Sequence, residues 1–370
     1  MSDPRSTVLH HRHRALGASF TDFGGWLMPV RYTSDLAEHH AVRAAAGLFD
    51  ISHMAEFEVT GSVAGDCLDA ALAGRLSTVA VGKAKYSLVL ADDGGIIDDV
   101  IVYRLAEDRF LIIANAGNRA PVWAALQERA EGWDAEVRDL TDDYALLAVQ
   151  GPAAVSVLEA TTGLSADGVA LAETSYYAST AGRFADAPLL IARTGYTGED
   201  GFELMVPIDA AEALWDALLA AGEPLGLVPA GLASRDTLRL EAGMPLYGHE
   251  LSRDVTPAQA GLGRVVAAQK ETFVGRDALA ARAAEPAPVL VGLVSEGRRA
   301  GRAGYRVLGP DEVPVGEITS GALSPTLGHP IALAYVASEF AAVGTELGID
   351  VRGTRIPATV APLPFYRRKK

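Results

Sequence analysis

The stretch from residue 85 to residue 115, KYSLVLADDGGIIDDVIVYRLAEDRFLIIAN, constrains the fold more than any other part of the chain. Apolar and polar residues alternate along it with the period of two that is typical of strands, and short turns interrupt the alternation. Strands joined by so few residues pair as antiparallel hairpins, because a parallel pair needs a crossover of roughly a dozen residues or more. A second stretch, LLIARTGYTGEDGFELMVPI, has the same character. The sequence therefore predicts mostly antiparallel sheets.

Helical patterns lie between the strand-like stretches, at residues 35–46, 152–162, 209–221 and 230–242. Asp35 and Glu38 have the spacing of a capping box, which predicts Asp35 as the N-cap of the first helix. Because the strands follow one another in hairpins and do not alternate strictly with helices, the predicted fold class is α+β. The prolines of RAAEPAPV, residues 282–289, predict a break before a separate β-rich domain.

Charge and hydropathy exclude several kinds of partner. The formal charge of −15, from 32 Lys and Arg against 47 Asp and Glu, repels phosphate backbones and anionic lipids, so neither nucleic acid nor a membrane is expected. No apolar run approaches the roughly 20 residues that cross a bilayer, and no signal-peptide pattern opens the chain, so we expect a cytoplasmic protein. The tail Arg367–Lys370 is interpreted as a solvated end or, alternatively, as a local anion-binding segment.

Cofactor signatures are absent from the sequence. A single cysteine, Cys67, excludes an internal disulfide, a thiolate zinc site and a cysteine-ligated iron–sulfur cluster. His10, His11 and His13 lack the spacing of a helical metal-ligand pair, so we expect them to face solvent. The patterns GxGxxG, GxxxxGK[ST], GxSxG and HExxH do not occur, so dinucleotide-binding, P-loop, nucleophile-elbow and zinc-protease chemistry have no support.

Adjacent carboxylates in GGIIDDVIVY are the first candidate for chemistry. Strand alternation places Asp99 on the face of Tyr103 and Asp98 on the opposite face, so one aspartate lies among apolar neighbours whichever face is buried. Such a carboxylate needs a partner, and burial would raise its pKa toward values that suit proton transfer. Alternatively, the strand has only just left its turn and both aspartates are solvated.

Glu203 and Arg235 are further candidates. Glu203 lies within the strand of GFELMV, opposite Phe202 and Leu204, and is either a site residue or the outward face of an amphipathic strand. Arg235 is four residues before Arg239 on the helical segment, and two arginines at this spacing repel each other unless nearby anions offset the repulsion. Either this helix is a self-neutralising surface, or a guanidinium faces a cleft that holds a carboxylate or a planar ligand.

Along nearly its whole length, the chain resembles the aminomethyltransferase, or T-protein, family of the glycine cleavage system. The resemblance rests on motifs in the family's order and spacing: DFGGWLMPVRY, AVRAAAGLFDISHM, GKAKYSLVL, GGIIDDVIVY, LLAVQGPAA, RTGYTGEDGFEL, AGLASRDTLRLEAGMPLYGHE, FVGRDAL, VGEITSGALSPTLGHPIALAYV and PFYR. It implies a three-domain cloverleaf with mostly antiparallel sheets and a C-terminal β-barrel-like domain. We assign residues 1–55 and 139–247 to a discontinuous folate-binding core domain. Residues 56–138 form an inserted α+β hairpin domain, and residues 248–370 a linker and the barrel-like domain.

The resemblance also implies the reaction. The family moves an aminomethyl one-carbon unit from the dihydrolipoyl arm of the lipoylated H-protein to tetrahydrofolate, which gives 5,10-methylenetetrahydrofolate and ammonia. Tetrahydrofolate is the acceptor substrate, and no metal, flavin or NAD is expected. By motif, Asp99 resembles the family's central carboxylate and is the predicted catalytic residue. The predicted folate-binding residues are Glu203, Arg235, Tyr86, Asn115, Tyr196, Tyr366 and Arg367.

Other members of the same superfamily give alternative functions. A folate-binding protein that serves iron–sulfur cluster assembly would carry a KGCYxGQE-type motif, whereas the matching stretch here reads KETFVGRDAL without cysteine. Demethylating oxidase relatives add a flavin domain, for which this chain has neither the length nor a dinucleotide motif. A non-catalytic folate-binding or lipoyl-domain-binding protein stays open, because binding and catalytic residues overlap.

Overall fold

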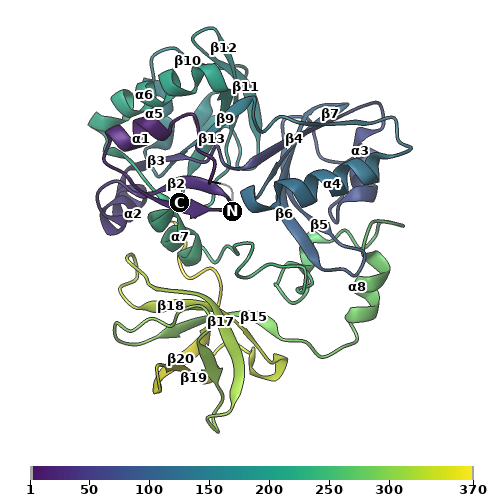
Figure 1. Cartoon of the computed structure of the whole chain (residues 1–370), viewed down its shortest axis with the longest axis vertical. Coiled ribbons are helices and arrows are strands. Elements are labelled where there is room, and N and C mark those ends of the chain that lie inside the picture. Colours follow the sequence, from purple (N-terminus) through teal and green to yellow (C-terminus); the bar gives the residue numbers. More distant parts are fainter. Residues whose placement is uncertain (1–2, 369–370) are drawn as a thin grey trace. The chain divides into compact units, whose positions relative to one another are not determined.

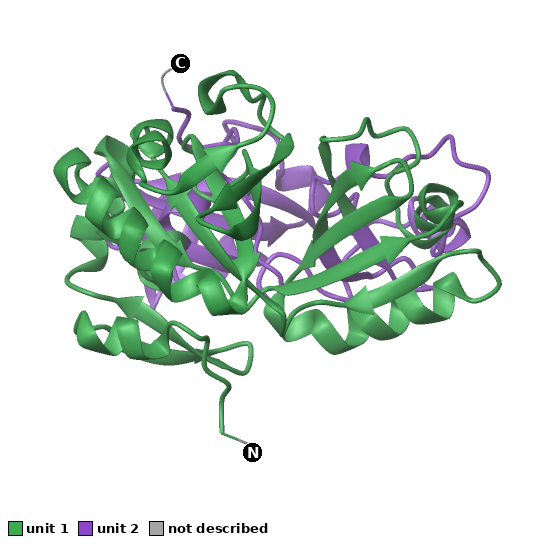
Figure 2. Cartoon of the chain, turned by 90° about the horizontal axis from the view of Figure 1, so that it is seen from above, with its two compact units in different colours: residues 1–87, 100–235 green, residues 88–99, 236–370 purple. Residues whose placement is uncertain are grey.

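The computed structural model describes residues 3–368, which form two compact units (Figure 2). The first unit runs to Ser87 and resumes from Val100 to Arg235. The second unit contains Leu88–Asp99 and the described residues from Asp236 onward. Half of the predicted basic tail, Lys369 and Lys370, lies outside the described residues.

A seven-stranded sheet is the centre of the first unit (Figure 1). Its strands, in spatial order, are β10 (Leu164–Ala166), β11 (Ser179–Phe184), β12 (Ala187–Ala192), β13 (Gly201–Pro207), β9 (Tyr144–Gln150), β3 (Ala46–Asp50) and β14 (Leu227–Pro229). The neighbouring strands pair antiparallel except for β14, which runs parallel to β3. Both faces of β13 and β9 are buried, so even their polar side chains lie inside the protein.

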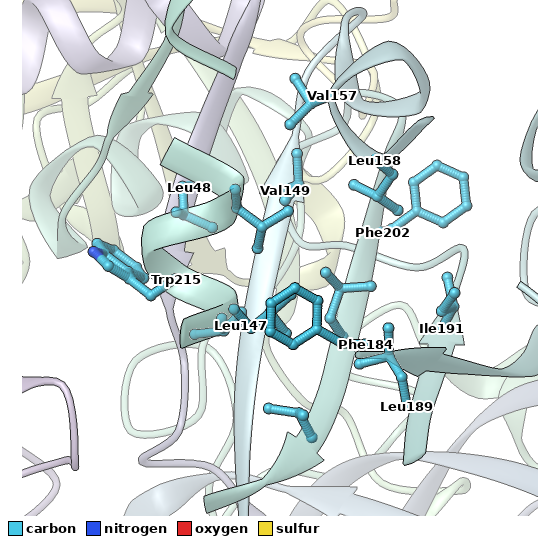
Figure 3. Close-up of a cluster of buried hydrophobic side chains, with 14 of the residues drawn as sticks. Leu48, Leu147, Val149, Val157, Leu158, Phe184, Leu189, Ile191, Phe202 and Trp215 are labelled. Carbon is cyan, nitrogen blue, oxygen red and sulfur yellow. The ribbon is translucent and has the colours of Figure 1, made fainter. Parts of the chain in front are cut away.

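One face of this sheet packs against α5 (Ala154–Ala160) and α6 (Ala211–Gly222). Leu147 and Val149 on β9, Phe202 on β13 and Trp215 on α6 belong to a single apolar cluster (Figure 3). Strand alternation sends Phe202 into this cluster and therefore sends Glu203 to the opposite face. The core thus fixes the direction in which Glu203 points.

The second sheet has five strands, and two of its strands, β5 and β6, have residues in both units. In spatial order they are β5 (Ala84–Leu90), β6 (Ile96–Ala106), β7 (Arg109–Ala114), β4 (Ala55–Thr60) and β8 (Glu136–Asp139), accompanied by α3 (Ala64–Ala71) and α4 (Arg119–Ala130). The strands β5, β6 and β7 are the hairpins that the alternating stretch predicts. The three-domain division proposed from the sequence stays a prediction.

The start of the chain forms α1 (His10–Ala15), the hairpin of β1 (Ser19–Phe23) and β2 (Trp26–Arg31), and α2 (Asp35–Ala44). The N-cap of α2 is Ser34, whose hydroxyl accepts a hydrogen bond from the amide of Ala37, so the prediction of Asp35 as the cap is wrong by one residue. Glu38 accepts hydrogen bonds from the amides of Tyr32 and Thr33, which precede the cap, and these are not the bond to the cap's own amide that a capping box makes. His13 is also buried and not solvent-facing, because it pairs with a buried aspartate.

The second unit ends in a closed barrel of six strands. In order around the barrel they are β15 (Val289–Ser295), β18 (Pro330–Val336), β17 (Pro314–Leu323), β16 (Arg306–Leu308), β19 (Glu346–Val351) and β20 (Thr354–Ala361). The proline-containing segment after α8 (Arg276–Arg282) leads directly into β15, as the composition break predicts. The α+β class with mostly antiparallel sheets and a C-terminal barrel is therefore confirmed.

The helix α7 (Leu232–Glu241) carries Arg235 at the end of the first unit and continues into the second. Short 3₁₀ helices complete the structure: η1 (Ala116–Asn118), η2 (Leu171–Glu173), η3 (Ile208–Ala210), η4 (Glu223–Leu225), η5 (Gly263–Val265) and η6 (Ser338–Phe340). Among residues 3–368, no helix is both long enough and apolar enough to span a bilayer.

Candidate functional site

Glu203 is a buried carboxylate in the middle of the seven-stranded sheet. On β13 it lies opposite Ala148 of β9 and Ala192 of β12, and only 9% of its surface is exposed. Its Oε2 accepts hydrogen bonds from Thr194 Oγ1 at 2.5 Å and from the Tyr103 hydroxyl at 3.3 Å. These donors offset part of the cost of removing a carboxylate from water. The alternative of a solvated outward face does not apply, because both faces of this central strand are covered.

Tyr103, on β6, is a residue of this cluster that the sequence analysis did not name as a site residue. Its hydroxyl lies 2.9 Å from Thr194 Oγ1, and burial together with the Glu203 charge raises the pKa of Tyr103 well above its ordinary value. The phenol therefore keeps its proton and remains a donor to Glu203 at neutral pH. Strand alternation placed Tyr103 on the face of Asp99, which was the one sequence signal that pointed to it.

One guanidinium nitrogen of Arg235, in the same unit, is unsatisfied. Its Cζ lies 5.1 Å from the ring centroid of Tyr196 and 6.0 Å from that of Phe49, and its Nη1 is buried with no hydrogen-bond partner among the described residues. Burial lowers the pKa of Arg235, and the negative charge of Glu203 opposes that shift. A buried donor without a partner is uncommon in folded proteins and marks a place where a ligand can bind.

Arg239 is self-neutralised, as the surface-helix alternative predicted, but it is buried and not on a surface, and Arg235 is not neutralised in this way. Arg239 donates from Nε to Asp236 at 2.8 Å and from Nη1 to Glu250 at 2.9 Å, all within the second unit. No ion pair of Arg235 is present among the residues that the structure describes. The two arginines of α7 thus differ: one is neutralised within the protein, and the other has a buried guanidinium nitrogen without a partner among the described residues.

The loop that carries Tyr196 is fixed by the side chain of Gln150 at the end of β9. Gln150 Nε2 donates to the Thr194 carbonyl at 3.1 Å, and Oε1 accepts from Thr197 Oγ1 at 2.9 Å. A Cβ on Gly195 would lie 2.0 Å from Gln150 Oε1, and one on Gly201 would lie 2.4 Å from Nε2. Only glycine lets this amide approach the loop backbone so closely.

Two ion pairs hold the same loop from its other sides. Arg43 donates to the Thr197 carbonyl at 2.7 Å and to Glu199 at 3.0 Å, and Arg193 makes a two-nitrogen contact with Asp200. The pair of Arg43 with Glu199 is buried, so solvent screens it little. The loop is therefore rigid on both sides of Tyr196, which places its ring against Arg235.

Tyr86 and Asn115 are also in the first unit and are both partly exposed. Tyr86 lies on β5, and Asn115 follows β7 as the residue that precedes η1. The tip of the β1–β2 hairpin packs against η1, which follows Asn115, since a Cβ on Gly24 would lie 3.1 Å from the amide nitrogen of Gly117. These positions leave both side chains accessible, as a ligand-binding role requires.

In the second unit, the structure distinguishes the two adjacent aspartates. Asp98 is fully buried on the face of Ile96 and Val100, whereas Asp99 is partly exposed. The Tyr247 hydroxyl donates to the Ile96 carbonyl at 3.1 Å, and burial and the charge of Asp98 raise the pKa of Tyr247. One aspartate does lie among apolar residues, as alternation requires, and it is Asp98. Asp99 is the aspartate that a substrate could reach.

Tyr366 and Arg367 belong to the second unit as well. The amide of Tyr366 donates to the carbonyl of Glu241 at 2.8 Å, which ties the last described residues to the end of α7. The Glu241 carboxylate accepts from Ser324 and Thr326, so this attachment is firm. Tyr366 is partly exposed and Arg367 is exposed.

Two surface hollows lie away from the predicted residues. One of about 500 Å³ is lined by barrel residues that include Glu296 and His329, and one of about 250 Å³ is lined by residues that include Asp92 and Arg276. None of the predicted site residues lines either of them. Within residues 3–368, no group of three or more His, Cys, Asp or Glu side chains is arranged to hold a metal ion.

Comparison with known families matches two models in sequence order. Residues 9–270 match the GCVT N-terminal domain, and residues 289–367 match the glycine cleavage T-protein C-terminal barrel domain. The chain is 57% identical to an aminomethyltransferase of Streptomyces avermitilis, with 99% of each chain covered. It is 46% identical to an aminomethyltransferase of Moorella thermoacetica, with both chains fully covered.

The fold agrees with a solved relative. The crystal structure of the glycine cleavage system aminomethyltransferase T from Bartonella henselae superposes with a TM-score of 0.91 at 38% identity and covers 99% of both chains. Sequence and fold agree over essentially the full length of the chain. The chain therefore belongs to the glycine cleavage T-protein family, whose members are aminomethyltransferases.

Proposed function

We propose that the chain moves an aminomethyl group from the dihydrolipoyl arm of a lipoylated H-protein to tetrahydrofolate. Family membership makes it an aminomethyltransferase of the glycine cleavage system. The finer proposal concerns the donor, the acceptor and the residues that bind them. The products are 5,10-methylenetetrahydrofolate, ammonia and the reduced arm, and the reaction takes place in the cytoplasm.

One observation carries the acceptor site: Arg235 keeps a buried nitrogen without a partner, beside a buried carboxylate and two aromatic rings. A pterin is flat and presents donors and acceptors along one edge, like guanine. Glu203 accepts from such donors, the Arg235 guanidinium donates to such acceptors, and the ring of Tyr196 supplies an apolar wall. The residues present therefore fit tetrahydrofolate.

Asp99 is proposed as the catalytic residue. The folate loses the hydrogens on two of its nitrogens as it gains the carbon; one of them ends on the arm's sulfur and the other on ammonia. An iminium-like cation forms when the C–S or C–N bond breaks. A carboxylate at this point stabilises the cation and guides the proton. The partly exposed position of Asp99 on β6 supports this role, since a catalytic group must touch substrate.

The remaining predicted residues are proposed to contact the folate. Tyr86 and Asn115 offer a ring and an amide from the five-stranded sheet and its following turn. Tyr366 and Arg367 offer a ring and a cation from the end of the chain. An exposed arginine suits the carboxylates of the folate tail, which remain near solvent. No metal, flavin or NAD has a part in this proposal.

Turnover with the natural reactants tests the proposal. The purified protein is mixed with aminomethyl-loaded H-protein and tetrahydrofolate, and ammonia and methylenetetrahydrofolate are measured over time. Equal rates of both products are expected, with neither product formed when unloaded H-protein is used. Stoichiometric folate binding without either product would contradict the proposal and favour a folate-binding protein without this activity.

A further inference from the structure

His53 is a buried histidine in the segment between β3 and β4 that the proposed reaction does not use. Only 3% of its surface is exposed, and its Nδ1 is buried with no hydrogen-bond partner among the described residues. Its ring packs edge-on against Phe23, with ring centroids 5.6 Å apart. Phe23 fixes the ring plane but offers Nδ1 no hydrogen bond from its side chain, so the imidazole is placed without being satisfied.

The surroundings of His53 keep its imidazole neutral. Burial lowers the pKa of His53 to about 4; the Arg235 cation acts in the same direction, and the Asp50 carboxylate opposes it. Asp50 is already occupied, because it accepts hydrogen bonds from His13, Thr7 and the amide of Ser52. At physiological pH, His53 is therefore a neutral group with one unsatisfied nitrogen.

Arg235 and His53 share one property, an unsatisfied buried nitrogen, and they lie near each other. Each has a buried nitrogen without a partner, and the two side chains are close enough for the charge of one to shift the other. A single unsatisfied atom can be a local defect, but two adjacent ones indicate a shared ligand. A site that combines one cation with a neutral imidazole suits a flat, uncharged heterocycle better than it suits an anion.

We propose that His53 is a further binding residue for the acceptor substrate and that its Nδ1 forms a hydrogen bond with the polar edge of the heterocycle next to Arg235. This inference rests on the proposed function, because the heterocycle is taken to be the pterin of tetrahydrofolate. Glu203, Arg235 and His53 then contribute an acceptor, a charged donor and a neutral group to one planar ligand.

Two substitutions at His53 distinguish the contribution of the Nδ1 hydrogen bond from that of the side-chain volume. His53→Asn places an amide where Nδ1 lies, whereas His53→Leu keeps the bulk and removes the hydrogen bond. In calorimetry with tetrahydrofolate, we expect His53→Leu to weaken binding about tenfold and His53→Asn to retain binding within about threefold of the parent, as loss of one hydrogen bond implies. His11→Leu, at an exposed histidine of the same unit, is the control and should bind as the parent does.

A measurement on the unaltered protein guards against variants that fail to fold. With ¹⁵N-labelled histidine, the Nδ1 resonance of His53 should shift when tetrahydrofolate is added, and the resonances of exposed histidines should not. If His53→Leu binds folate as tightly as the parent, or if the Nδ1 resonance does not move at saturation, the inference is wrong. If the parent itself binds no folate, the proposed function fails first, so the two failures are distinguishable.

Discussion

His13 Nε2 lies 2.8 Å from Asp50 Oδ2 in the interior of the first unit, where the two side chains are 1% and 0% exposed. Tyr32 contacts the other nitrogen of His13 at 2.9 Å, and Thr7 donates to the same carboxylate at 2.6 Å. The pair joins α1 to the end of β3. It thereby attaches the first helix to the sheet that holds Glu203.

Loss of His13 should be costly, because it leaves the buried Asp50 carboxylate without its His13 hydrogen bond. Burial alone would raise the pKa of Asp50, but the hydrogen bond to His13 holds this pKa below its ordinary value. The stabilisation therefore exists above about pH 4 and is lost as pH falls. We expect His13→Leu to lower the free energy of unfolding by about 3–5 kcal/mol at pH 7, measured by urea denaturation. His11→Leu, whose side chain is exposed, should change it by about 0.5 kcal/mol or less. Equal effects of the two substitutions would show that the buried pair does not stabilise the fold.

Glu203 and Arg235 should matter for binding tetrahydrofolate. Replacing either by alanine removes a charge-assisted hydrogen bond, so folate binding should weaken by about 1.5–3 kcal/mol in calorimetry. Tyr103→Phe removes one of the two hydrogen bonds to Glu203 and should cost a smaller amount, about 1 kcal/mol. Folate affinity that is unchanged in both alanine variants would exclude this cluster as the acceptor site.

Asp99→Asn should separate turnover from binding. The amide keeps the shape of the side chain but cannot carry negative charge or accept the proton, so aminomethyl transfer should fall by about two to four orders of magnitude. Folate binding should lose only about 1 kcal/mol. The matched control is Asp98→Asn, whose carboxylate is buried on the other face of β6 and should not touch substrate. The reverse result, an inactive Asp98 variant and an active Asp99 variant, would mean that the carboxylates have exchanged roles.

Gly195→Ala tests the loop that carries Tyr196. The added Cβ would lie 2.0 Å from Gln150 Oε1, so the amide must move and its two bonds to the loop must weaken. We expect a loss of about 1–3 kcal/mol in stability together with weaker folate binding. Gly263→Ala, where the nearest atom is 4.0 Å away, is the control and should leave both measurements unchanged. A tolerated Gly195→Ala substitution would show that the loop is not held by Gln150.

Glu56 should make the protein less stable as pH rises. Both of its carboxylate oxygens are buried without a partner among the described residues, and burial, followed by the charge of Asp139, raises the pKa of Glu56 well above its ordinary value. In the unfolded chain the group ionises near pH 4.5, so above that pH the folded state loses about 1.4 kcal/mol per pH unit until it ionises too. Glu56→Gln resembles the protonated form and should escape this loss. Its advantage over the parent, followed by calorimetric melting from pH 5 to 8, should grow with pH, and a constant difference would contradict the pKa shift.

Local sequence patterns predicted the features that depend on neighbouring residues, namely individual strands and the break between domains. The alternation of residues 85–115 gave β5, β6 and β7, and the proline-containing break preceded the barrel. The choice between Ser34 and Asp35 as helix cap depends on where the chain turns, which composition does not encode. His13 lies in a helix of six residues, too short to show a buried face by periodicity.

The site required contacts between residues distant in sequence. Tyr103 and Glu203 are 100 residues apart, and no local pattern brings them together. The face of Glu203 was ambiguous because alternation cannot show that both faces of a central strand are covered. Residue patterns alone indicated the aspartate pair and Arg235, and the family resemblance selected Asp99 and added Tyr196. Phe49 and His53 became visible only when their neighbours in space were known.

The fit between Gln150 and its two glycines also limits how this sequence can change over generations. A side chain at position 195 or 201 would occupy the volume of the Gln150 amide, so neither glycine can be replaced first without disturbing the loop. A smaller residue at position 150 would make room for a replacement of Gly195, but it would give up the two hydrogen bonds that hold Thr194 and Thr197, and at position 201 the Val149 carbonyl would still lie 2.7 Å from an added Cβ. Substitutions at 150 and 195 should therefore arise together or not at all, so among relatives a residue larger than glycine at 195 should accompany a residue smaller than glutamine at 150, whereas position 201 should stay glycine.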